Sequence, residues 1–206
     1  MYKHYKLSNL LMLVLLVLFP LTSNCYVYNE LDFKVISKPK LISYTYSKDQ
    51  YLISSVADVL VLHEGFSSNP YRDSNGNWTQ GYGRHVGNKK IYKVSKKTAY
   101  EWLYEDIRVV IRALDEKVPW WRKLNPARQQ VLINMTYNVG PDGIIKFKRF
   151  LDAMETRQYT KASKELLYNG SNKTKYWKQV GVRAEQLALA TKTGKWDMEA
   201  LKAYYS

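Results

Sequence analysis

Hydrophobic side chains recur with helical spacing along much of the chain. Five apolar positions on one face predict a helix over residues 51–64, which Gly65 would end. They are Leu52, Val56, Val59, Leu60 and Leu62. A second stripe predicts a long helix over residues 98–118, where Thr98 and Glu101 match a capping box. Its apolar positions are Leu103, Ile107, Val110, Ile111, Leu114 and Val118.

The rest of the pattern predicts further helices and one small sheet. Asn125 followed by Pro126 is typical of a helix N-terminus, and the apolar run behind them predicts a buried helix that stops at Gly140. Shorter helices are predicted over residues 144–155, 159–168 and 182–193. Residues 76–84 alternate in polarity and contain three glycines, which indicates a small hairpin or meander. The expected fold class is therefore α+β.

Length and composition are those of one compact domain with a short extension. The 206 residues are 46% hydrophobic, which is enough for a substantial core. Lysine and arginine total 32 against 18 acidic residues, and the formal net charge of +14 favours a polyanionic partner: nucleic acid, an anionic membrane or the bacterial cell wall. Because acidic and basic residues are mixed through the predicted helices, we do not expect a nucleic-acid partner. We also expect a monomer.

The cysteine and histidine counts argue against disulfides and metal sites. Cys25 is the single cysteine, and the chain has three histidines, which is a poor basis for a structural zinc site. Residues 73–77 are similar to part of a calcium loop, but Arg84 stands at the twelfth position, where such a loop needs glutamate. We therefore expect no metal and no cofactor.

Glu64, Asp73 and Thr79 are the candidate catalytic residues. Glu64 falls at the end of a predicted helix, Asp73 in a polar turn and Thr79 in the predicted hairpin. Pro70 and the pair Asn75–Gly76 are expected to reverse the chain, which would fold the three side chains around one hollow. Two carboxyls across a gap suit glycoside hydrolysis. On spacing alone, however, the same residues also fit a solvated helix end, an ordinary turn and a strand.

The sequence around these three residues resembles the phage-type lysozymes, glycoside hydrolase family 24. The matching positions are Glu64, Gly65, Tyr71, Asp73, Gly76, Thr79, Gly81 and Gly83. Two later blocks, within residues 132–140 and 177–185, follow in the same order. The resemblance implies a lysozyme-like fold, in which a long helix joins a small β-hairpin lobe to a larger helical lobe, and it makes residues 51–206 the catalytic domain.

The resemblance also implies an activity. The family hydrolyses the β-1,4 bond between N-acetylmuramic acid and N-acetylglucosamine, so peptidoglycan is the expected partner. By this likeness Glu64 protonates the glycosidic oxygen and Asp73 stabilises positive charge or activates water. Thr79 would position that water, which predicts inversion at the anomeric carbon.

Three further residues gain a role by the same likeness. Arg183 would pair with Glu64 across the cleft, and Tyr137 and His85 would contact the saccharide. Two rival functions remain open. One is a non-catalytic, basic binder of the cell wall or another polyanion on a lysozyme scaffold, and the other is a lytic transglycosylase, which works with one acid and no positioned water.

The N-terminal 25 residues predict export. Lys3 and Lys6 precede an apolar run over residues 10–19, which matches a secretory signal and is shorter than the roughly 20 residues that span a bilayer. Cys25 allows a lipidated form instead. Some phage lysozymes use an anchor that later leaves the membrane, but this segment is rich in leucine, so we rank a cleaved signal first, a retained anchor second and a releasable anchor third. We expect a periplasmic or extracellular protein, and interpret residues 26–50 as a tether or a strand-like extension.

Overall fold

The computed structural model describes residues 39–73, 76–87 and 92–206. The chain divides into two units, Met1–Pro39 and Lys40–Ser206. The predicted export segment, residues 1–25 with Cys25, lies outside the described residues, as do residues 26–38 of the predicted tether. None of the helices in the described ranges combines the length and hydrophobicity of a membrane span.

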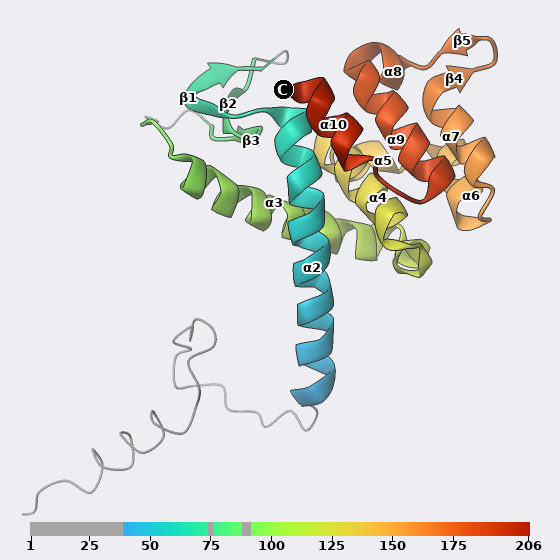
Figure 1. The fold of residues 1–206 in the computed structure, drawn as a ribbon, viewed down its shortest axis with the longest axis horizontal. Helices are drawn as coiled ribbons and strands as arrows, with labels where there is room; N and C mark the ends of the chain where they lie inside the picture. Colours follow the sequence, from blue (N-terminus) through green and yellow to red (C-terminus); the bar gives the residue numbers. More distant parts are fainter. Residues whose placement is uncertain (1–38, 74–75, 88–91) are drawn as a thin grey trace, which may run out of the picture. The chain divides into compact units, whose positions relative to one another are not determined.

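The described chain is mostly helical, with two small antiparallel sheets (Figure 1). The first half contains α2 (Pro39–Glu64), β1 (Ser67–Arg72), β2 (Trp78–Gly81), β3 (Arg84–His85), α3 (Lys96–Lys117) and the 3₁₀-helix η1 (Pro119–Lys123). The second half contains α4 (Pro126–Val139), α5 (Pro141–Ile144), α6 (Lys148–Glu155), α7 (Tyr159–Leu167), β4 (Tyr168–Asn169), β5 (Asn172–Lys173), α8 (Lys175–Val180), α9 (Val182–Thr193) and α10 (Met198–Tyr205).

The first helix is longer than the sequence predicted. The pattern placed its start at residue 51, but α2 begins at Pro39, so the strand-like interpretation of residues 39–50 is wrong. Proline suits the first turn of a helix, because that turn needs no backbone donor and proline already has a helical φ. No glycine or proline interrupts residues 40–51, and the helix continues without a break into the predicted stripe.

The three-stranded sheet has the order β1-β2-β3. Thr79 in the central strand β2 lies opposite Tyr71 on β1 and His85 on β3. Pro70 does not reverse the chain as predicted, because it lies inside β1, where the register with β2 is irregular. An edge strand tolerates proline because the missing N–H faces away from the ladder.

The long helix α3 joins the sheet to the helical lobe, as expected. Its cap is Ser95, whose side chain accepts a hydrogen bond from the Thr98 backbone, so the predicted capping box at Thr98 is wrong. Gly81 of β2 lies against α3, since a Cβ there would come within 3.1 Å of the Ala99 Cβ. Figure 1 shows the sheet near the start of α3, whereas α4 lies near the other half of that helix.

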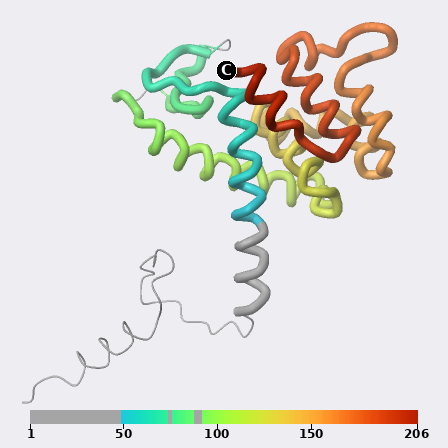
Figure 2. The backbone as a smooth tube through the Cα atoms, in the orientation of Figure 1, coloured from blue at the N-terminus to red at the C-terminus, as the bar shows by residue number. Residues whose placement is uncertain are grey.

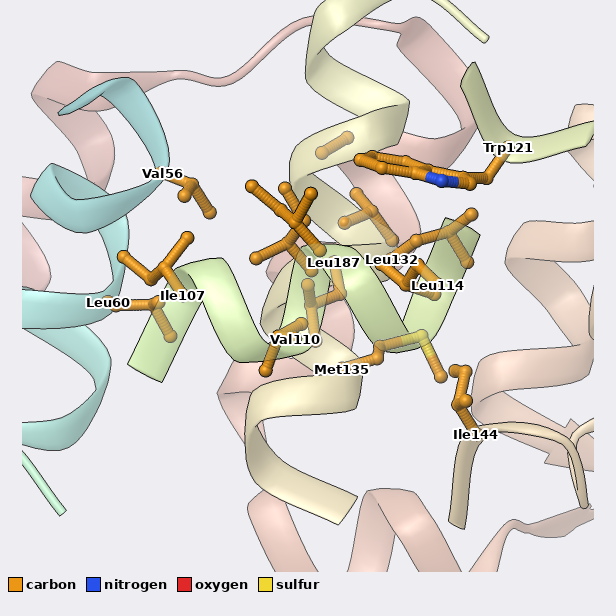
Figure 3. Close-up of a cluster of buried hydrophobic side chains, with 14 of the residues drawn as sticks. Val56, Leu60, Ile107, Val110, Leu114, Trp121, Leu132, Met135, Ile144 and Leu187 are labelled. Carbon is orange, nitrogen blue, oxygen red and sulfur yellow. The ribbon is translucent and has the colours of Figure 1, made fainter. Parts of the chain in front are cut away.

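The apolar stripe of α3 forms the centre of the core (Figure 3). It packs against side chains from α2, α4 and α9, and Trp121 of η1 is completely buried among them. The core residues labelled in the figure are Val56, Leu60, Ile107, Val110, Leu114, Trp121, Leu132, Met135, Ile144 and Leu187. The predicted α+β class, with a small sheet and a larger helical lobe, is confirmed.

The helices after α3 follow the sequence signals unevenly. Asn125 caps α4 and Pro126 opens it, as predicted, and α9 spans residues 182–193 as predicted. The helix predicted over residues 144–155 is instead the short α5 followed by α6, which begins at Lys148. The C-terminal helix α10, which the pattern did not predict, returns to the end of α2 (Figure 2). There the Tyr205 and His63 rings lie 5.7 Å apart.

Candidate active site

A cleft of about 650 Å³ lies between the three-stranded sheet and the helical lobe. Five of the six site residues predicted from the sequence line it: Glu64, Asp73, Thr79, His85 and Tyr137. They come from the end of α2, from the sheet and its turn, and from the last turns of α4. The fold therefore brings together the side chains that the turn signals and the resemblance had associated.

Glu64 is the last residue of α2, and its carboxyl is mostly buried. Its side chain is 18% exposed, and Arg183 Nη1 donates to its Oε1 at 2.6 Å. The other oxygen, Oε2, faces the hairpin at Gly83, where an added Cβ would lie 3.4 Å from it. Gly83 has a φ of +91°, a backbone conformation that favours glycine.

Arg183 approaches Glu64 from inside the helical lobe, where its side chain is only 7% exposed. Its Nε and Nη2 donate to the Asn134 Oδ1 at 3.1 and 2.9 Å, and Nη2 also reaches the Asn134 carbonyl oxygen at 3.3 Å. The contact between Arg183 and Glu64 that the resemblance implied is therefore present. Because one guanidinium donates to both Asn134 on α4 and Glu64 on α2, it fixes the orientation of the Glu64 carboxyl.

Asp73 lies in the turn after β1, across the cleft from the helices. Its Oδ1 accepts a hydrogen bond from the Asn77 backbone N–H at 2.8 Å, and its Oδ2 lies 3.2 Å from the His85 Nε2. The Asp73 side chain is 19% exposed and the His85 side chain 63%. His85, predicted to contact the saccharide, thus stands at the open edge of the cleft beside a candidate catalytic carboxyl.

Thr79 and Tyr137 line the inner part of the cleft. Thr79 is only 3% exposed, and its hydroxyl makes a long contact of 3.4 Å to the Asn77 carbonyl oxygen. The Tyr137 hydroxyl donates to the Tyr82 carbonyl oxygen at 2.7 Å, which connects α4 to the sheet lobe. Burial raises the pKa of Tyr137, so its phenol is a neutral donor in that bond.

Sequence reasoning missed several residues that shape the site. Asn134 accepts hydrogen bonds from Arg183. It lies in one of the blocks that resemble the family, but the sequence pattern assigned it no role. Arg84 of β3 forms a bidentate contact with Asp106 of α3, and its Nη2 lies 2.7 Å from the Asp106 Oδ1. Both residues line the cleft. Burial opposes the charged form of Arg84, but the two carboxylates beside it hold its pKa above the usual value.

The described residues contain no group of three or more His, Cys, Asp or Glu side chains that could hold a metal ion.

A small sheet and a helical lobe that enclose a cleft with two carboxyls define a lysozyme-like protein. The chain belongs to the phage lysozyme family, whose model matches residues 61–185 of its 206 residues. Probable T4-type lysozymes 1 and 2 of Dictyostelium discoideum are each 23% identical over 141 residues, which covers 56% of this chain and 83% of each relative. The pre-baseplate central spike protein Gp5 of Enterobacteria phage T4 is 26% identical over 165 residues, 68% of this chain and 28% of that protein.

Proposed function

We propose that this protein is an exported muramidase, which hydrolyses the β-1,4 bond between N-acetylmuramic acid and N-acetylglucosamine in peptidoglycan. The observation that carries the proposal is one cleft lined by Glu64, Asp73 and Thr79, with Arg183 bonded to Glu64 from behind. The family supports peptidoglycan as the substrate. The net charge of +14 suits a wall that carries acidic polymers.

The contacts of Glu64 assign different tasks to its two oxygens. Oε1 accepts a charge-assisted hydrogen bond from Arg183, so this oxygen carries no proton. Oε2 faces the hairpin at Gly83, where the missing side chain leaves this oxygen open. Oε2 is therefore the atom that donates a proton to the glycosidic oxygen, and Arg183 stabilises the carboxylate that remains.

Asp73 and Thr79 act on the other side of the sugar. Asp73 stabilises positive charge at the anomeric carbon or activates a water, and Thr79 positions that water from the inner part of the cleft. An attack by water on the face opposite the leaving group inverts the anomeric centre. In inverting glycosidases the two carboxyls stand roughly 6.5 to 9.5 Å apart, which leaves room for that water.

The test begins with Glu64→Gln, which keeps the size of the side chain and removes the acid. We expect this variant to fold and to lose the ability to clear a peptidoglycan suspension. Glu116→Gln, at an exposed position on α3, is the matched control and should lyse at the wild-type rate. Clearing at an undiminished rate by Glu64→Gln would place the active site elsewhere.

Product analysis tests the roles of Asp73 and Thr79. NMR of the first product should show the inverted anomer, and a retained anomer would exclude water attack positioned by Thr79. Thr79→Glu places a carboxylate where the water should stand, so we expect loss of normal turnover and a trapped or altered covalent product. Wild-type kinetics in that variant would remove Thr79 from the mechanism.

The main rival is a non-catalytic binder that uses its positive charge to adhere to the wall or another polyanion. Binding that falls steeply with salt, together with no release of reducing sugar, would favour it. A lytic transglycosylase would instead release an anhydro sugar. The presence of Asp73 and Thr79 on the same cleft as Glu64 favours hydrolysis over both.

Export rests on residues 1–25, and we propose a cleaved signal in preference to a retained or releasable anchor. Lipidation at Cys25 is the alternative that would tether the mature protein to a membrane. Mass spectrometry of the N-terminus recovered from an expressing cell distinguishes these forms, because each leaves a different terminal mass. An intact Met1 would overturn the cleaved signal.

A further inference from the structure

His63 precedes Glu64 and belongs to a chain of hydrogen bonds that reaches the catalytic carboxyl from behind. Its Nε2 lies 3.0 Å from the Gln186 Oε1, and its Nδ1 lies 3.1 Å from the Asn134 Nδ2. The Tyr205 hydroxyl donates to the same Gln186 oxygen at 3.3 Å. The ring thus connects α2 with α4, α9 and α10.

The contacts define which nitrogen of His63 carries the proton. Both amide atoms of Asn134 lie near the His63 Nδ1, Nδ2 at 3.1 Å and Oδ1 at 3.4 Å. Oδ1 already accepts two hydrogen bonds from Arg183, which can only donate, so we infer that the shorter contact, from Nδ2, is the hydrogen bond to His63. The His63 Nδ1 therefore accepts, and its Nε2–H donates to Gln186. This neutral tautomer is inferred from the partners, as histidine tautomers generally are.

We propose that His63 is a positioning residue for Glu64, acting through Asn134 and Arg183. By accepting from the Asn134 amide, His63 keeps Oδ1 of that amide turned toward the guanidinium, and Arg183 then holds Glu64 Oε1. The proposal rests on the proposed function, since it assumes that Glu64 is the proton donor. It assigns the histidine a task that the sequence pattern did not give it.

Protonation of His63 would break this arrangement. An imidazolium donates from both nitrogens, so it would need Asn134 Oδ1, the atom that Arg183 occupies. The other titratable groups near the ring are Arg183 on α9, Tyr205 on α10 and Glu64 beside it on α2. Burial and the positive charge of Arg183 both lower the pKa of His63, to about 4, which keeps the neutral tautomer in place near pH 7.

Two variants at His63 separate the two halves of the chain of bonds. In His63→Asn an amide oxygen replaces Nδ1 and can still accept from Asn134, whereas in His63→Gln an amide nitrogen replaces Nε2 and keeps only the bond to Gln186. We expect His63→Gln to lower kcat by about tenfold or more with little change in KM, because the acid is misplaced. His63→Asn should lose less than about threefold. Equal losses in both variants would overturn the proposal.

NMR tests the proposal without an activity assay, and its first measurement uses the wild-type protein alone. The ¹⁵N shifts of His63 at pH 7 should show an unprotonated Nδ1 and a protonated Nε2, and the opposite tautomer would exclude the proposed chain. The Arg183 Nε–H should exchange slowly in wild type and His63→Asn and rapidly in His63→Gln. Equally slow exchange in both variants would reduce His63 to a packing role.

Gln129→Met, on α4 like Asn134, is the matched control for lost buried hydrogen bonds. Gln129 donates to the carbonyl oxygens of Arg122 and Leu124, away from the cleft, so its loss should cost stability and leave kcat unchanged. A fall in kcat in Gln129→Met equal to that in His63→Gln would attribute the effect to stability and overturn the proposal. If wild type shows the predicted tautomer and Arg183 exchange but does not cleave peptidoglycan, the proposed function fails and the chain of bonds stands.

Discussion

The low pKa of His63 makes the stability of the protein depend on pH. In the unfolded chain a histidine has a pKa of 6.5, and in the folded protein that value falls to about 4 because the ring is buried and faces the Arg183 cation. Between these two values the unfolded chain binds a proton that the folded protein does not. The free energy of unfolding therefore rises with pH across this window. The contribution of His63 to that free energy is lost as the solution is acidified.

The size of the effect follows from the same two values. A pKa that falls from 6.5 to about 4 is worth about 3 kcal/mol, since each pH unit corresponds to about 1.36 kcal/mol. Because the ring is not fully buried, we expect the measured contribution to be about 2 to 3 kcal/mol. It should be fully present above pH 6.5 and absent near pH 4.

Urea unfolding of wild type and His63→Asn at pH 7, 5.5 and 4 measures this contribution. Asparagine does not titrate, so the difference in unfolding free energy between the two proteins isolates His63 from the carboxylates that also titrate in acid. Wild type should lose about 2 to 3 kcal/mol relative to the variant on going from pH 7 to pH 4. Parallel pH profiles, or an NMR titration of His63 with a pKa near 6.5, would refute the reasoning.

Three further changes test the surroundings of the site. Tyr176→Phe removes a buried hydroxyl that has no partner among the described residues, so thermal unfolding should show a gain of about 1 kcal/mol at pH 7. Gly83→Ala should lower the lysis rate about tenfold or more, because it places a methyl group in contact with Glu64 Oε2, the proposed proton donor. Gly87→Ala, also at a positive φ but with no atom within 4 Å of the added Cβ, should lyse normally. Arg183→Met should cost about 3 kcal/mol in urea unfolding, because it leaves a mostly buried carboxylate unpaired. Adding Glu64→Gln to Arg183→Met should recover most of that loss of unfolding free energy.

The elements that the sequence predicted well are those whose signals are local. The cap at Asn125 and the stripe of α3 act within one helix, and both are present as expected. The signals failed where a neighbour decided the outcome. Pro70 is compatible with a strand only because β1 lies at an edge of its sheet, and the sequence alone does not show which strand is at the edge.

The residues of the candidate site also differ in whether a local signal or a distant neighbour places them. Glu64 and Asp73 were identified from a helix end and a turn, both close in sequence to Thr79. The partner of Glu64, however, is 119 residues away, and only the resemblance to a family pointed to Arg183. No local pattern contains the information that two such distant residues meet in a buried contact, because that contact depends on how α9 packs against α4 and α2.

The limits of the hydrophobic pattern are clearest in α4, where polar residues occupy buried positions. Gln129, Gln130, Asn134 and Thr136 are all buried, although a periodicity argument assigns polar positions to solvent. Three of them contact different elements. Gln129 donates to η1 and to the residue after it, Gln130 donates to Ser55 on α2, and Asn134 accepts from Arg183 and contacts His63. A buried amide is stable only when its hydrogen bonds are satisfied, so each amide fixes one neighbour at a defined position. The central helix therefore orients the site through its polar side chains, while its apolar side chains supply the core.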